Sequence, residues 1–318
     1  MSTSEPTYHP APFDDPLADL IIRSADGIDF RVFKIDLIRS SPVFKDMMSL
    51  PQSPDSRARD EHRDGMPVVP VSESAYTLTL FLRFCAVGSS PALESFADVI
   101  DVMAPARKYQ HAAIERSAAL TLISLAEAEP VRAYALGCVY GMEDVARAAA
   151  LYSLRHPPTA LVEKASPELD LASAQDLRRL LDYRHKCAKA VSSYMSSWTN
   201  PGCGSEIQDW DVCQTREWCF DRSGNQLCRP LWWTGLLTQL ASTLQECTWE
   251  GIIRDKDLAD FALMEQPCGK ACSHPSLYIA AYKALATLRT NVAAQIGQVS
   301  VLLCTFEPLL SVRVAGQA

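Results

Sequence analysis

The 318-residue sequence has no apolar run long enough to cross a membrane, which takes about 18 uninterrupted apolar residues. Its most apolar helical stretch, 276–304, is interrupted by Lys283 and Arg289. The first 16 residues also lack the basic start and the apolar centre of a secretion signal. We therefore expect a protein that is not secreted and that resides in the cytoplasm or the nucleus.

An excess of basic charge is missing too. Lysine and arginine total 30 against 38 aspartates and glutamates, which gives a formal net charge of −8. Nucleic-acid-binding proteins normally present a basic surface, and anionic lipid would repel this chain. Neither nucleic acid nor a membrane is therefore expected as a partner.

Local clusters of charge do not change this expectation. In the stretch 51–65, Arg57, Arg59 and Arg63 are offset by neighbouring acidic residues. Arg178, Arg179 and the stretch 184–189 form one basic helical face, which we interpret as a solvated face.

Familiar enzyme motifs are absent as well. The sequence has no P-loop, no H-E-x-x-H and no G-x-S-x-G, and Gly202-Cys203-Gly204 lacks the third glycine of a dinucleotide site. Cys187 and His185 are two residues apart on an expected helix, so they point to different faces and do not form a nucleophile pair. The sequence predicts no enzyme, no catalytic residues and no bound cofactor.

The first 126 residues divide into a proline-rich start, residues 1–16, and a longer region, residues 17–126, with strand and helix patterns. Four prolines favour a disordered tail over residues 1–16. Residues 17–126 combine β-branched runs with helical spacing, which predicts an α+β domain: a hairpin, a helix pair, a mobile loop over 51–65, a third strand and further helices. Ser41 followed by Pro42 is typical of a helix start.

The rest of the chain is expected to be all-α with irregular loops. It divides into a helical extension, 127–198, and a region rich in cysteine and tryptophan, 199–318. All six tryptophans lie between 198 and 249, so we expect them to form the core of a second compact unit. Helical spacing predicts helices over 130–140, 143–154, 175–198, 232–248, 256–264 and 276–304, with 199–230 irregular.

Residues 17–126 resemble the BTB/POZ domain. The resemblance is carried by ADLIIR at 18–23, DFRVFK at 29–34 and LIRSSPVFKDMM at 37–48, in which an early aspartate, a hairpin and a Ser-Pro-x-Phe turn follow in a fixed order. The family commonly has a histidine where this chain has Phe33, before Lys34. The whole chain is similar to fungal BTB proteins with a helical C-terminal half that contains cysteine and tryptophan.

The resemblance implies a protein-interaction module that associates with itself or with other proteins, as an adaptor or scaffold does. Prolines cannot sustain a sheet ladder, so a dimer made by exchanging an N-terminal strand is not expected. The resemblance also implies that Asp19 is buried beside Lys34, because an unpaired buried carboxylate costs several kcal/mol. The expected interaction surface comprises Asp19, Lys34, Ile35, Leu37, Ile38 and Phe44.

Alternative functions stay open. One is a substrate adaptor of a cullin-type ubiquitin ligase, although such adaptors carry an apolar-x-Glu motif where this chain has Leu50-Pro51-Gln52. Another is a zinc- or cysteine-dependent enzyme within residues 199–275. A third is a transcriptional regulator that works through partner proteins.

Two interpretations apply to the C-terminal cysteines. A structural zinc site takes four Cys or His ligands, usually as two close pairs. Cys213 with Cys219 and Cys268 with Cys272 are such pairs, but their gaps are wider than the C-x-x-C of the similar fungal proteins. The wide spacing favours the other interpretation, in which these cysteines are small buried apolar residues. In either case we expect the two pairs to lie close together.

Overall fold

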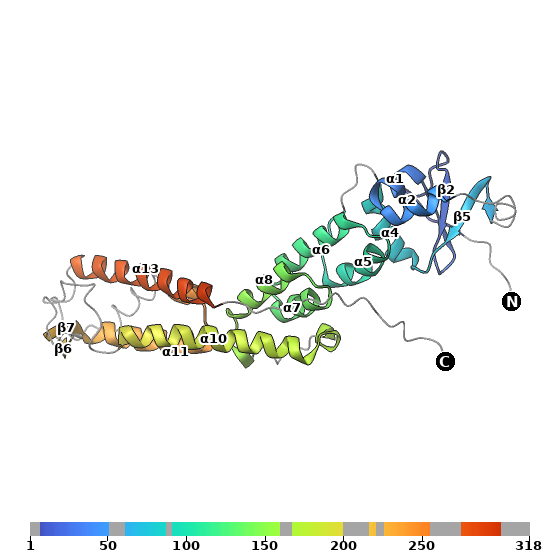
Figure 1. The fold of residues 1–318 in the computed structure, drawn as a ribbon. Coiled ribbons are helices and arrows are strands. Elements are labelled where there is room, and N and C mark those ends of the chain that lie inside the picture. Colours follow the sequence, from blue (N-terminus) through green and yellow to red (C-terminus); the bar gives the residue numbers. More distant parts are fainter. Residues whose placement is uncertain are drawn as a thin grey trace. The chain divides into compact units, whose positions relative to one another are not determined.

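The computed structural model of the chain describes residues 7–50, 61–86, 91–159, 167–199, 216–220, 226–254 and 275–299. The chain divides into two compact units, Met1–Leu125 (unit 1) and Ala126–Ala318 (unit 2). Unit 1 combines a small sheet with helices, and the described part of unit 2 is mostly helical (Figure 1). The expected α+β class is confirmed. No helix among the described residues is long and apolar enough to span a membrane.

The sheet of unit 1 has five strands in the order β1-β3-β2-β5-β4. β2 and β3 form the predicted hairpin, and Gly27 in its turn takes a φ of 81°, which glycine adopts without strain. β5 runs parallel to β2 on the other side, so β2 is the central strand. The bounds are β1 Thr7–Tyr8, β2 Leu20–Arg23, β3 Ile28–Val32, β4 His62–Arg63 and β5 Met66–Pro70.

Helices complete unit 1 (Figure 1). They are α1 (Lys34–Ser40), α2 (Pro42–Ser49), α4 (Ala75–Cys85), α5 (Phe96–Lys108) and α6 (Ala112–Leu125). Ser41 separates α1 from α2 and caps α2 as predicted, because its hydroxyl accepts a hydrogen bond from the N–H of Phe44 at 3.1 Å. The same hydroxyl donates to the carbonyl of Tyr109 at 2.6 Å. Ser41 thus ties the helix pair to the end of α5.

An aromatic cluster fixes these helices in the core. Phe44 of α2 stacks on Tyr109, with ring centroids 4.5 Å apart, and Phe81 of α4 lies 5.2 Å from the same ring. Phe30 of β3 and Leu37 of α1 are also fully buried. Burial of such large side chains supplies much of the stability of a small domain.

Residues 7–16 correct the expectation of a disordered tail over 1–16. β1 pairs in parallel with β3, the N–H of His9 donates to the carbonyl of Asp29, and the N–H of Arg31 donates to that of Phe13. Phe13 is buried, and the His9 ring stacks on Phe30 at 4.4 Å. The prolines of this segment fall between the bonded positions, so the ladder loses no donor. The N-terminal segment, residues 7–13, therefore covers the outer edge of β3.

The replacement Phe13→Leu should lower the free energy of unfolding of unit 1 by about 1 kcal/mol, because leucine refills only part of the buried space. The control is Leu17→Ala, at a side chain that is 80% exposed, which should change this free energy by less than about 0.5 kcal/mol. Urea denaturation measures both. Equal effects of the two replacements would show that the segment is not packed as described.

The expected loop over 51–65 is also partly structured. Residues 62 and 63 form β4, which pairs with β5, and Asp64 and Gly65 take positive φ angles of 53° and 77° in the connecting turn. A strand of two residues has no periodicity to reveal it. Residues 51–60 of this loop lie outside the described part of the chain.

Unit 2 contains the helices expected from Pro130, Glu143 and the later apolar stretches. They are α7 (Pro130–Val139), α8 (Glu143–Ser153), α10 (Ala174–Thr199), α11 (Leu231–Glu246) and α13 (Pro275–Gln298), with short 3-10 helices η1 (Pro167–Leu171) and η3 (Glu250–Ile252). The expected helix over 256–264 and the extension of the last helix to 304 fall on residues that are not described.

Packing in unit 2 involves the long helices and one close backbone approach. α10 packs against α11 and α13, and Trp232 and Trp233 of α11 are buried. Trp198 and Trp249 are half-buried, whereas Trp210 and the side chain of Trp218 are outside the description. α7 and α8 also pack together, and there a Cβ on Gly137 would lie 2.9 Å from the backbone nitrogen of Ala146.

The interval 199–230, expected to be irregular, contains a hairpin. β6 (Arg216–Phe220) and β7 (Gln226–Pro230) pair antiparallel, with Arg216 opposite Pro230 and Phe220 opposite Gln226. The sequence between the two strands, DRSGN, is rich in turn-forming residues and was the available signal for this hairpin.

Candidate functional site

Asp19 is exposed, which corrects the prediction that it is buried beside the Lys34 ammonium. Its Oδ1 accepts a hydrogen bond from the backbone N–H of Lys34 at 2.8 Å. The first N–H groups of a helix have no partner within the helix and form its positive end. Asp19 therefore caps α1 from a neighbouring segment, and its carboxylate stays in water.

The other expected surface residues divide between the core and the surface. Leu37 and Phe44 are buried and belong to the core, which corrects their assignment. Ile35 is 55% exposed, and Lys34 and Ile38 are half-buried. Leu17, which the sequence did not single out, is 80% exposed. We call Leu17, Asp19, Lys34, Ile35 and Ile38 the α1 surface.

A pocket of about 220 Å³ shares α1 with this surface. It lies where four chain segments meet. It was not predicted from the sequence, because these segments are spread between residues 12 and 86 and share no motif. Its lining consists of Pro12 and Phe13 of the N-terminal segment, residues 31–33 at the end of β3, Asp36 and Leu37 of α1, and Leu82, Cys85 and Ala86 at the end of α4.

The pocket wall is apolar apart from three side chains. Burial raises the pKa of the Cys85 thiol to about 12, so the thiol is neutral and a poor nucleophile at pH 7. The Asp36 carboxylate makes no ion pair among the described residues. Arg31 pairs through Nη2 with Asp64 at 2.6 Å, but its buried Nε has no hydrogen-bond partner in the described structure.

A buried ion-pair network joins the strands of unit 1. The Asp29 carboxylate is 0% exposed, and Arg23 Nε and Arg63 Nη1 each lie 2.6 Å from one of its oxygens. Burial by itself raises the pKa of Asp29, but the hydrogen bonds and charges of Arg23 and Arg63 outweigh it and hold the pKa below its ordinary value. Arg63, expected in the mobile loop over 51–65, is thus held by an ion pair to a strand of the sheet.

Tyr8 extends this network to β1. The guanidinium carbons of Arg31 and Arg63 lie over its ring, 4.6 and 4.1 Å from the centroid, and its hydroxyl donates to Asp64 at 2.5 Å. Arg23 reaches Glu61 at 2.5 Å as well. The network thus contains three arginines, at 23, 31 and 63, and three carboxylates, at 29, 61 and 64. Because these charges balance, we interpret the network as one that stabilises the sheet and not as a binding site for a charged ligand.

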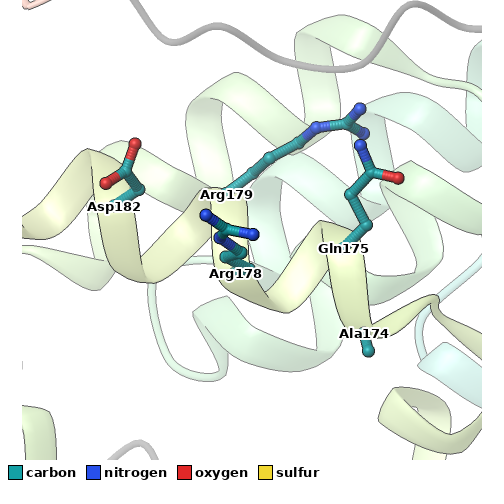
Figure 2. Close-up of a pocket in the computed structure, with 5 residues that line it drawn as sticks. All are labelled: Ala174, Gln175, Arg178, Arg179 and Asp182. Carbon is teal, nitrogen blue, oxygen red and sulfur yellow. The ribbon is translucent and has the colours of Figure 1, made fainter.

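A second hollow, of about 440 Å³, lies on α10 in unit 2 (Figure 2). Its described lining comes from a single helix: Ala174, Gln175, Arg178, Arg179 and Asp182. Figure 2 shows Arg178 and Arg179 extending to different sides of α10, and Arg179 pairs with Asp176 at 3.1 Å. The two basic groups do not converge on one point, so the hollow offers no site for an anion.

Arg184 departs from the solvated basic face predicted for this helix. It is buried and donates hydrogen bonds to the carbonyls of Ser153 and, at 2.8 Å, of His156. Burial lowers the pKa of Arg184. A cation at the carboxyl end of a helix is stabilised by the helix dipole, so Arg184 acts as a cap for α8.

The described side chains contain no group of three His, Cys, Asp or Glu residues that could hold a metal ion. Cys213, Cys268, Cys272 and the side chain of Cys219 lie outside the description. The expectation that the two cysteine pairs lie close together stays a prediction.

Comparison with protein-family models finds no match for this sequence, and comparison with curated proteins finds none either. The structure defines a mixed α+β protein that is mostly helical and has a small five-stranded sheet. Its best-formed candidate site is the α1 surface with the adjoining pocket.

Proposed function

We propose that unit 1 is a protein-interaction domain of the BTB/POZ type in a non-enzymatic adaptor or scaffold protein that acts in the cytoplasm or the nucleus. The order of its elements supports this proposal. The hairpin β2–β3, the helix pair joined at Ser41, then β5 and three further helices follow one another as the sequence resemblance implies.

The α1 surface is the observation that carries the proposal. Leu17 is two residues from Asp19, and Ile35 is next to Lys34, so the Asp19–Lys34 hydrogen bond brings two exposed apolar side chains into one region. Neighbouring exposed apolar side chains are typical of surfaces that bind other proteins. Asp19 adds a carboxylate at the edge of this region, where a partner can also be recognised by charge.

The replacement Ile35→Asp should weaken association by more than about tenfold, because it places a charge at the centre of the proposed contact. Association is measured by light scattering for self-association and by affinity purification of the tagged full chain for other partners. Recovery of a cullin would favour the ligase-adaptor form of the proposal.

The matched control is Leu120→Asp, on α6 of the same unit. Leu120 is 70% exposed, so the two replacements put the same charge on comparable surface positions. Circular dichroism checks that both variants fold. Equal weakening by both variants, or a wild-type chain that stays monomeric and recovers no partner, would refute the proposed function.

A further inference from the structure

The pocket beside α1 has a size that suits one side chain of a bound protein. Sites for small molecules usually enclose about 300–1,000 Å³, whereas an apolar cavity of about 150 Å³ holds a benzene ring. A pocket of about 220 Å³ therefore falls below the usual small-molecule range and accommodates one large apolar side chain. Phe13, Leu37 and Leu82 supply apolar walls from three separate segments.

One polar group of the lining, the Asp36 carboxylate, indicates what should accompany that side chain. The half-buried Asp36 carboxylate lacks a cation among the described side chains, and a basic residue of the bound chain can supply that charge. Arg31, the other charged residue of the lining, is already paired with Asp64, so Asp36 supplies an uncompensated negative charge to the pocket.

We propose that this pocket anchors a partner polypeptide by one large apolar side chain, with a basic residue next to it that pairs with Asp36. The inference rests on the proposed interaction function and names the kind of sequence that is bound. A single apolar side chain in a well-formed pocket commonly carries much of the binding energy of an interface. The pocket and the α1 surface share the helix α1, which supplies Asp36 and Leu37 to the pocket and Ile35 and Ile38 to the surface.

Short peptides test the two requirements separately on the full chain. The probes are acetyl-Lys-Phe-amide, acetyl-Glu-Phe-amide and acetyl-Lys-Gly-amide, and binding is followed by the methyl NMR signals of Val32, Leu37 and Leu82. Lys-Phe should bind with a Kd in the millimolar range, Glu-Phe about threefold more weakly, and Lys-Gly not measurably. In Asp36→Asn, Lys-Phe and Glu-Phe should bind equally, because the charge that distinguishes them is gone.

A second test fills part of the pocket by a replacement in its wall and measures peptide binding again. Ala86→Leu adds bulk to the pocket wall and should weaken Lys-Phe binding by more than about tenfold, whereas Ala113→Leu, at an exposed position on α6, should leave it unchanged. Unchanged methyl signals elsewhere in unit 1 show that both variants are folded.

Three outcomes would overturn the proposal: no binding of Lys-Phe, equal binding to wild type and Ala86→Leu, or tighter binding of indole than of Lys-Phe. The last would assign the pocket to a small molecule. If Ile35→Asp still abolishes association while Lys-Phe fails to bind, the pocket proposal fails and the interaction function stands. If instead neither association nor peptide binding is found, both fail.

Discussion

The replacement Asp29→Asn should lower the free energy of unfolding of unit 1 by about 2–3 kcal/mol. The change keeps the shape of the side chain but leaves Arg23 and Arg63 facing each other without the carboxylate between them. Breaking a fully buried ion pair costs about 3–5 kcal/mol. We expect less here, because both arginines are partly exposed and water screens their charges.

Asp64→Asn is the matched control for this prediction, since Asp64 belongs to the same network but its side chain is 51% exposed. Its effect should stay below about 1 kcal/mol. Urea denaturation of the two variants and the wild type measures the difference, and equal losses would contradict the assigned role of Asp29.

The pH dependence of stability provides an independent readout. The pKa of Asp29 is lower in the folded chain than its unfolded value of about 3.9, so the ionised carboxylate stabilises the fold at higher pH. This contribution is lost as the pH falls below about 4 and through the folded-state pKa. The wild type should therefore lose more stability on acidification than Asp29→Asn does.

The replacement Gly137→Ala should destabilise unit 2 by about 2–3 kcal/mol. The added Cβ would meet the backbone nitrogen of Ala146 at 2.9 Å and its Cα at 3.2 Å. Backbone atoms cannot rotate away as a flexible side chain can, so α7 and α8 must move apart and lose buried contact.

Gly297→Ala in α13 is the comparison for this second prediction. A Cβ at Gly297 meets nothing within 4 Å, and alanine favours helix over glycine, so the change should stabilise unit 2 by a few tenths of a kcal/mol. Thermal or urea unfolding of unit 2 should show opposite signs for the two variants. A loss of similar size at both positions would show that helix propensity, and not the close approach, decides the effect.

Features encoded by neighbouring residues were predicted well from the sequence. The run 20–22 predicts β2, Ser41 predicts the start of α2, and Pro130 predicts the start of α7, because each signal acts over one or two turns of chain. β1 and β4 were missed because strands of two residues exist only through the partners that they pair with.

The candidate site was predicted less completely, since burial depends on distant parts of the chain. The sequence places Ile35 and Leu37 in one helix, but seven residues do not reveal which face meets the core. Asp29 and Arg63 are 34 residues apart, and no local pattern joins them. The expected burial of Asp19 failed for the same reason: its neighbours Ala18 and Leu20 are buried in the core, whereas the Asp19 side chain is exposed.

The two hydrogen bonds of Ser41 restrict which amino acids this position can accept. The hydroxyl accepts from the N–H of Phe44 and donates to the carbonyl of Tyr109. Threonine could keep both bonds, aspartate could only accept, and alanine could do neither. As related sequences diverge, this serine should persist while Ile35 on the surface changes with each new partner. A serine at this place in another chain would therefore reflect a requirement of the fold and say nothing about which protein that chain binds.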